Sequence, residues 1–146
     1  MRPDRDGTRP DALRRAEIVE LARAWIGTPY HHQASLRGVG ADCVGLLRGL
    51  WREIHGTEAE RPPAYSRDWA EASGRETLLA AAERHLVRVP IGERAAGDVL
   101  VFRIKTHVPA KHVGLVATND TFIHAMEGVC VSEVRLTGWW QRRIAA

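Results

Sequence analysis

The sequence of 146 residues has few cysteines and no long apolar run. No window approaches the roughly 18–20 apolar residues that a membrane-spanning helix needs, so we expect no membrane span. Two cysteines, Cys43 and Cys130, are too few for a secreted scaffold held by disulfides. Residues 1–10 are charged and lack the apolar core of a signal peptide. We therefore expect synthesis in the cytoplasm, with another carrier needed for any work outside the cell.

Charge of one sign is not concentrated anywhere along the chain. The net charge is +3, and the basic residues, nearly all Arg, are scattered. Because a nucleic-acid-binding arm needs clustered basic residues, we expect no DNA or RNA partner. Cysteine and histidine lack CxxC or HxxxH spacing, so a metal-binding module is the weaker interpretation and no cofactor is expected. The length indicates one domain, residues 1–146, with residues 1–8 as a flexible lead-in.

The first half of the chain has helical periodicity interrupted by loops. Apolar residues recur there at three- and four-residue spacing. The predicted helices cover residues 8–26, 42–54 and 73–86. Ser73 and Glu76 have the spacing of a capping box, which predicts the start of the third helix. Residues 57–72 are predicted to form a loop containing Tyr65, and loops of this length in compact domains are often functional.

The second half changes to short apolar runs bounded by Gly, Asn and Asp. The predicted strands cover residues 99–102, 112–116, 121–124 and 129–134. The spacers between them are short, which favours antiparallel pairing. The sequence therefore predicts an α+β fold, with N-terminal helices packed on a small antiparallel β-sheet. Cys130 is expected to be a buried residue of the last strand.

A cysteine at the predicted start of a helix is the main chemical feature. At that position the positive end of the helix dipole favours the thiolate of Cys43. A cysteine nucleophile also needs a base, and the base needs a group that orients it. His112 and His124 lie on successive predicted strands, where a hairpin can place them side by side. The competing interpretation is that Cys43 is only a small buried apolar residue.

Several segments, in order, resemble the NlpC-type cell-wall peptidases. These are papain-like cysteine peptidases that cut the peptide stems of bacterial peptidoglycan. The matching segments are Gly27–Tyr30, Asp42–Leu46, Gly97–Phe102, His112–Leu115 and Phe122–Ala125. Tyr30–Gln33 and Ala110–His112 also resemble the subgroup encoded with phage tails and phage-like gene transfer particles. The resemblance implies a papain-like NlpC-type fold.

The resemblance also implies a role for each matching residue. Cys43 would be the nucleophile, His112 the general base, and His124 the group that orients His112. Tyr30 corresponds to the family tyrosine that lies beside the nucleophile, near the oxyanion. Asp42 precedes the cysteine, as in the family, and is interpreted as a helix N-cap.

Two departures from the family pattern lie close to these residues. Val44 stands where many members have Ser. The glycines that commonly follow the Pro-Tyr segment are replaced by residues 31–33, which include His31 and His32. Both histidines are possible substrate contacts, as is His107 in the loop before His112.

The function implied by the resemblance is a peptidoglycan endopeptidase that hydrolyses an amide of the peptide stem or cross-link. Such an enzyme would belong to a phage-like tail, with tail-tip or baseplate proteins as partners. It would be carried in the particle and act in the periplasm or the cell wall. Two alternatives remain open: a structural tail component without activity, and an amidase or acyltransferase on the same fold.

Overall fold

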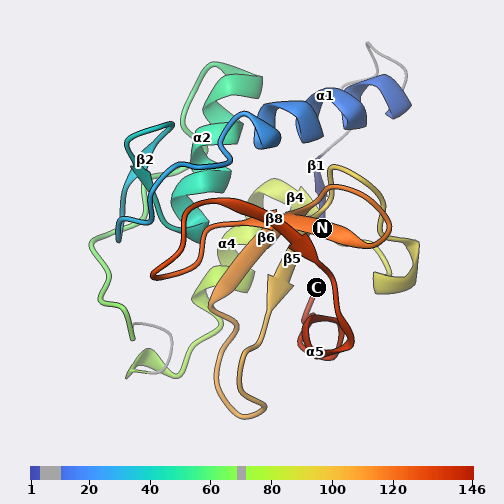
Figure 1. Cartoon of the computed structure of the whole chain (residues 1–146). Coiled ribbons are helices and arrows are strands. Elements are labelled where there is room, and N and C mark those ends of the chain that lie inside the picture. Colours follow the sequence, from blue (N-terminus) through green and yellow to red (C-terminus); the bar gives the residue numbers. More distant parts are fainter. Residues whose placement is uncertain (4–10, 69–71) are drawn as a thin grey trace.

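The computed structural model describes residues 1–3, 11–68 and 72–146 (Figure 1). The helices are α1 (Asp11–Arg23), α2 (Cys43–His55), α4 (Thr77–His85) and α5 (Gly138–Gln141), with a 3-10 turn at Ile91–Glu93. The first four strands are β1 (Arg2–Pro3), β2 (Ser35–Leu36), β3 (Gly40–Ala41) and β4 (Leu86–Val87). The last four are β5 (Val99–Phe102), β6 (His112–Val116), β7 (Thr121–His124) and β8 (Ser132–Arg135).

The main sheet has four antiparallel strands in the order β5-β6-β7-β8. Two small antiparallel pairs, β1-β4 and β2-β3, lie beside it. The α+β prediction is therefore confirmed. Strands β5, β6 and β7 have the predicted bounds, because each is a short run of apolar and β-branched residues between turns. No helix within the described ranges is long and apolar enough to span a bilayer.

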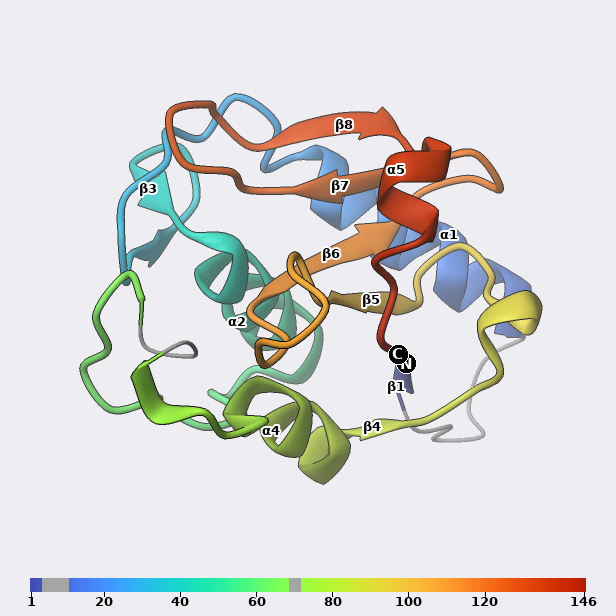
Figure 2. The ribbon, with the colours of Figure 1, turned by 90° about the horizontal axis from the view of Figure 1, so that it is seen from below.

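Helices cover both faces of the main sheet. Helices α1 and α2 lie on one face and α5 lies on the other (Figures 1 and 2). Side chains alternate along a strand, so Val113 and Leu115 of β6 join the larger core beneath α1 and α2. Phe122 of β7 joins a smaller core with Phe102 and Trp140 of α5. The molecule thus has a main core and a smaller aromatic one on opposite sides of the sheet.

Helix α2 has well-defined ends and a close fit against its neighbours. Asp42 caps its start by accepting a hydrogen bond from the backbone N–H of Gly45 at 2.7 Å. Gly56 ends it in the left-handed region, with φ 75°. A Cβ on Gly49 would lie 2.1 Å from the ring of Trp25, so glycine allows the turn that follows α1 to pack closely on α2. These ends match the predicted helix to within two residues.

Two other helix predictions need correction. Helix α1 ends at Arg23, three residues before the predicted end, and its predicted start falls on residues outside the described ranges. Helix α4 begins at Thr77, and Glu76 makes no capping hydrogen bond. The capping-box prediction is wrong because the carboxylate of Glu76 instead binds Arg103 and the N–H of Ala110.

The predicted last strand and lead-in also differ from the structure. Strand β8 begins at Ser132, because a turn closed by a hydrogen bond from Val129 N–H to the Met126 carbonyl occupies the preceding residues. Cys130 is consequently exposed, and the prediction of a buried strand residue is wrong. Residues 1–3, assigned to a flexible lead-in, contain β1, which pairs with β4. Residues 4–10 lie outside the described ranges.

Candidate active site

Cys43 is the first residue of α2 and lies against the start of β6. Its Sγ is 3.9 Å from the backbone carbonyl oxygen of Lys111. The backbone N–H of Val113 is also directed at the sulfur. Because Lys111 and Val113 are the two chain neighbours of His112, the packing of α2 on β6 places the sulfur beside the main chain that carries this histidine.

The Cys43 thiol is protonated in this environment. Burial raises its pKa to about 12, and the negative charge of Asp42 acts in the same direction. Backbone N–H groups of Val113, Val44 and Cys43 itself act to lower it. The expectation that the helix start favours the thiolate is therefore corrected: loss of hydration and a neighbouring carboxylate outweigh the dipole. Thiolate formation requires a base close to the sulfur.

The two predicted histidines form a direct hydrogen bond. His112 begins β6 and His124 ends β7, and Nε2 of His112 lies 2.8 Å from Nδ1 of His124. Burial lowers the pKa of His112 to about 3, and the neighbouring His124 adds to this. Burial also lowers the pKa of His124 to about 4. Both rings are thus neutral near pH 7, and one donates its N–H to the other.

Aromatic side chains of the smaller core enclose the histidine pair. The indole of Trp140 stacks on the ring of His112, with centroids 5.6 Å apart, and meets the ring of His124 edge-on at 5.2 Å. Phe102 contacts His112, and Phe122 contacts His124. This apolar enclosure removes water from the imidazoles, which is the physical cause of their low pKa values.

Asp42 connects the start of α2 to two loops. Its Oδ1 accepts the hydrogen bond from Gly45 N–H, and its Oδ2 accepts one from the N–H of Gln33 at 2.8 Å. The hydroxyl of Tyr65 donates a further hydrogen bond to Oδ2. The carbonyl of Tyr65 in turn accepts from Nε2 of His32 at 2.7 Å. Asp42 is therefore an N-cap, as predicted, and also an anchor for both loops.

Sequence reasoning did not assign a role to Tyr65. The available signal was an aromatic residue in the long loop over residues 57–72, next to Pro62 and Pro63. The structure shows that this loop reaches back to Asp42, the residue before Cys43. Burial, followed by the hydrogen bond to Asp42, raises the pKa of Tyr65 above its usual range, so the hydroxyl remains a donor.

The remaining predicted residues differ in their distance from the thiol. Tyr30 is half-buried, and burial, with the charges of Cys43 and Asp42, raises its pKa to about 12, which places it near both. His31 is exposed and packs against Gly40. His107 is exposed in the loop before β6. In the described part of the chain no three His, Cys, Asp or Glu side chains gather as a possible metal site.

The structure thus assembles the predicted site in two parts. Tyr30, Asp42 and Cys43 form one part, and His112 with His124 forms the other. The hydrogen bonds among described residues do not include one between the thiol of Cys43 and the ring of His112. Apo enzymes often hold catalytic contacts looser than the substrate complex does.

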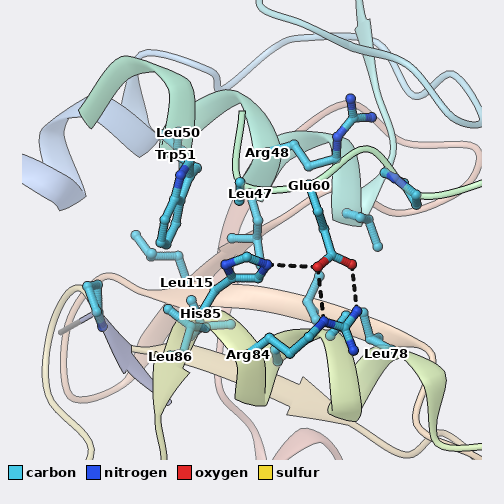
Figure 3. A pocket seen from close by; sticks show the side chains of 18 of the residues that line it. Leu47, Arg48, Leu50, Trp51, Glu60, Leu78, Arg84, His85, Leu86 and Leu115 are labelled. Carbon is cyan, nitrogen blue, oxygen red and sulfur yellow. Dashed lines mark hydrogen bonds and ion pairs between the residues drawn. The ribbon is translucent and has the colours of Figure 1, made fainter. Parts of the chain in front are cut away.

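An apolar pocket of about 290 Å³ lies between α2, α4 and the loop before Tyr65 (Figure 3). Leu47, Leu50 and Leu78 contribute to its walls. At its edge the carboxylate of Glu60 is paired with Arg84 and His85. The pocket's described lining contains Val44 and Val113 but neither the thiol nor the imidazoles, so it is not the reaction site.

The matching family model establishes what kind of protein carries this site. The NlpC/P60 family model matches residues 27–146, well over half of the chain. The chain belongs to the NlpC/P60 family. The matched range includes the helix-start cysteine and both histidines, while α1 precedes it.

Curated relatives of this NlpC/P60 chain include two Escherichia coli K12 proteins. The first, murein DD-endopeptidase MepS/murein LD-carboxypeptidase, is 25% identical over 130 residues, which are 88% of this chain and 59% of the relative. The second, probable endopeptidase NlpC, is 25% identical over 134 residues, which are 88% of this chain and 76% of the relative. The chain thus spans about three-fifths of the length of the first relative.

Solved structures show the same fold. The NlpC/P60 domain of peptidoglycan hydrolase SagA has a TM-score of 0.62 at 21% identity, covering 84% of this chain and 89% of the other. An NlpC/P60 family protein from Bacillus cereus has a TM-score of 0.64 at 22% identity, covering 89% of this chain and 38% of the other. The predicted papain-like NlpC-type fold is confirmed.

Proposed function

We propose that this NlpC/P60 domain is a cysteine peptidase that hydrolyses an amide of peptidoglycan stem peptides or cross-links. The observation that carries the proposal is the 2.8 Å hydrogen bond between His112 and His124, formed next to the main chain that touches the Cys43 sulfur. Cysteine peptidases use a catalytic triad. Its members are a thiol nucleophile, a neutral imidazole as general base, and a third group that orients the base, here a second imidazole.

The hydrogen bond between the imidazoles determines which nitrogen acts as the base. When the Nε2–H of His112 donates the hydrogen bond to Nδ1 of His124, Nδ1 of His112 is unprotonated and accepts the thiol proton. His124 therefore acts by holding the tautomer and the ring orientation of His112. The reaction requires the thiol of Cys43 and Nδ1 of His112 to come together when substrate binds, and the proton then passes between two neutral groups.

The reaction then follows acyl transfer to sulfur. The Cys43 thiolate attacks the scissile carbonyl carbon, and the resulting oxyanion lies near the N–H groups at the start of α2. Asp42 already occupies the N–H of Gly45, and the N–H groups of Cys43 and Val44, which act on the sulfur, are the ones close enough to bind the oxyanion. The leaving amine takes the proton from His112, and water activated by the same imidazole hydrolyses the thioester.

The substrate class rests on the relatives and on the site. The E. coli relatives are named as a murein endopeptidase and a probable endopeptidase, and an acyl-transfer site fits an amide of that material. We place the protein in a phage-like tail, with tail-tip or baseplate partners and action in the periplasm or wall, because residues 30–33 and 110–112 resemble the tail-associated subgroup. Mass spectrometry of purified particles tests this assignment, and absence of the chain from them contradicts it.

Digestion of purified sacculi tests the enzyme proposal directly. We expect the unaltered protein to release muropeptides that mass spectrometry identifies by the bond cut. Cys43→Ala should reduce release by about a thousandfold or more, since the nucleophile is removed. Cys130→Ala is the matched control and should retain activity, because this thiol is exposed. Full digestion by Cys43→Ala would sink the proposal.

A structural tail component without activity is the second candidate. It is favoured by the high pKa of Cys43 and by the lack of a thiol–imidazole hydrogen bond in the described residues. Failure of the unaltered protein to cut sacculi or soluble muropeptides supports this reading. Release of ammonia, or transfer of the acyl group to an added amine in place of hydrolysis, indicates the amidase or acyltransferase alternative.

A further inference from the structure

A second hollow lies on the polar side of α2, beside the loop that carries Tyr65. Its volume is about 610 Å³, and its charged lining, within the described ranges, is Arg48, Arg52, Arg61 and Glu58. We name these four residues the basic pocket. Three guanidinium groups and one carboxylate leave a formal charge of +2 in this hollow. Such an excess attracts an anion, and planar guanidinium groups match a carboxylate especially well.

Two of the three arginines are held in place before any ligand arrives. Arg48 Nε lies 2.7 Å from Glu58, and Arg52 Nη1 lies 3.0 Å from the other oxygen of the same carboxylate. Arg52 also donates to the hydroxyl of Ser35 at 2.9 Å. Burial acts to raise the pKa of Glu58, but hydrogen bonds from both arginines hold it below its usual value. The carboxylate therefore stays charged and fixes the two guanidinium groups.

Arg61 is the guanidinium that remains available. Its side chain is exposed, and it forms neither an ion pair nor a hydrogen bond within the described part of the chain. It lies next to Pro62 and Pro63, which restrict the backbone of its loop. Arg61 lines the same hollow as two arginines whose charge is already neutralised in part. It is therefore suited to complete the binding of one carboxylate.

The basic pocket shares a wall with the nucleophile. Tyr65 and Gln33 line the pocket, and both donate hydrogen bonds to Asp42, which precedes Cys43. Arg48 follows Cys43 by five residues on α2, which corresponds to about 7–8 Å along the helix axis. Arg52 lies one further turn along, at about 13–14 Å. An extended peptide spans about 3.3–3.6 Å per residue, so these distances correspond to two to four peptide residues.

We infer that the basic pocket binds a carboxylate of an acidic peptide substrate, about two to four residues from the bond that is cut. The inference rests on the proposed function for the identity of the cleaved bond. Its consequence is specificity: peptides with a free carboxylate at that distance bind more tightly than the same peptides with a carboxamide. Arg61 supplies the discriminating contact, and Glu58 opposes it by its charge.

Binding to the Cys43→Ala protein tests this without turnover. The probes are a synthetic stem peptide with free carboxylates and the same peptide with every carboxylate converted to carboxamide, titrated by calorimetry. Arg61→Gln should weaken binding of the acid by about three- to tenfold and leave the amide unchanged. Glu58→Gln should tighten binding of the acid about twofold or more, because it removes the competing charge. Arg135→Gln, at the exposed end of β8, is the matched control and should change neither.

The outcomes separate this inference from the proposed function. Equal weakening of both peptides by Arg61→Gln, equal effects of Arg61→Gln and Arg135→Gln, or no binding of the acid overturns the basic pocket. If the active protein cleaves both peptides and Arg61→Gln leaves KM unchanged, the peptidase proposal holds and the basic pocket is refuted. Selective binding of the acid without cleavage supports the pocket and refutes the peptidase.

Discussion

Cys43 and the histidine pair are held by opposite kinds of contact. Around Cys43 the contacts are polar and directional: one carboxylate, Asp42, receives hydrogen bonds from Gly45, Gln33 and Tyr65. Around His112 and His124 they are apolar, with three aromatic rings excluding water. The first arrangement positions a loop and a helix start. The second sets the protonation state of two imidazoles.

This difference predicts how strongly substitutions in each of the two regions should affect the protein. A hydrogen bond to a charged group contributes about 1.5–3 kcal/mol at most, so single changes near Asp42 should be moderate. A large aromatic side chain in a core contributes about 3–5 kcal/mol, so changes in the aromatic enclosure should be severe. Changes near Asp42 should mainly misplace the Cys43 thiol. Changes around His112 and His124 should mainly lower the free energy of unfolding and alter its dependence on pH.

The largest expected effect comes from Trp140. Trp140→Ala removes the ring that stacks on His112 and contacts Phe102 and Phe122, and should lower the free energy of unfolding by about 3 kcal/mol. Trp139→Ala is the matched control. Its side chain is 42% exposed and contacts Arg143 and the ring of Trp140 edge-on, outside the aromatic core, so the loss should be about 1 kcal/mol, roughly a third of that at Trp140. Urea denaturation measures both, and equal losses would contradict an aromatic core centred on Trp140.

Acid should destabilise the histidine side before it affects the carboxylates. Both imidazoles have folded-state pKa values below the ordinary 6.5, so the unfolded chain binds more protons between these values. Stability is complete above about pH 6.5 and falls as the pH drops towards 4, by about 1.4 kcal/mol per pH unit for each imidazole. Because both imidazoles contribute over the one pH unit below 6.5, denaturation curves at pH 7.5 and 5.5 should differ by about 2.7 kcal/mol.

A variant isolates this pH dependence. His124→Asn keeps a hydrogen-bonding partner for His112 but removes one titrating ring, so the difference between pH 7.5 and 5.5 should fall by about half. His107→Asn, in an exposed loop, should keep the wild-type difference. The carboxylates of Glu60 and Glu133, whose pKa values are lowered by their ion pairs, gain protons only below about pH 4.5, outside this window. An unchanged slope in His124→Asn contradicts the assignment.

A smaller effect is expected from Tyr65 on the polar side. Tyr65→Phe keeps the ring and removes only the hydroxyl that donates to Asp42, so stability should fall by about 1–2 kcal/mol. If the loop also positions the nucleophile, kcat should fall several-fold more than KM rises. Ser66 is the exposed chain neighbour of Tyr65, and Ser66→Ala should change neither stability nor kcat. Kinetics on soluble muropeptides and urea denaturation separate the two contributions.

The smallest effect concerns the contrast between the two cysteines. Cys130→Ser should alter stability by less than about 0.5 kcal/mol, because the side chain is exposed. In the unaltered protein a thiol reagent at pH 7.5 should modify Cys130 quickly and Cys43 slowly, since burial keeps the Cys43 thiol protonated. Peptide mapping after timed labelling measures both rates. Rapid labelling of Cys43 at pH 5–6 would show a preformed thiolate–imidazolium pair instead.

Local chemistry explains which parts of the fold were predictable. Asp42 and Gly56 lie at the two ends of α2 and determine its bounds through contacts within a few residues. Strands β5 to β7 were predictable because each is a short apolar run between turns. The start of α4 was not, because Glu76 is engaged by Arg103, 27 residues away in the chain.

The candidate site divides in the same way. Cys43, His112 and His124 could be named from residue type, predicted element ends and family resemblance. The part played by Tyr65 could not, because its hydroxyl meets Asp42 across 23 positions of the chain. The protonation state of Cys43 was also predicted in the wrong direction. A helix dipole is visible in a sequence, whereas the burial that outweighs it depends on which strand packs against the helix.

By itself, the sequence determined the residue types, the periodicities and the chain order of the chemistry: a cysteine at a capped helix start, then two histidines on successive strands. Only the tertiary structure decided how these groups behave. Packing of α5 encloses the imidazoles in aromatic rings and keeps them neutral, and packing of α2 on β6 keeps the thiol protonated. The physical reason is that periodicity and capping arise from neighbours along the chain, whereas desolvation and hydrogen bonding in a site arise from neighbours in space.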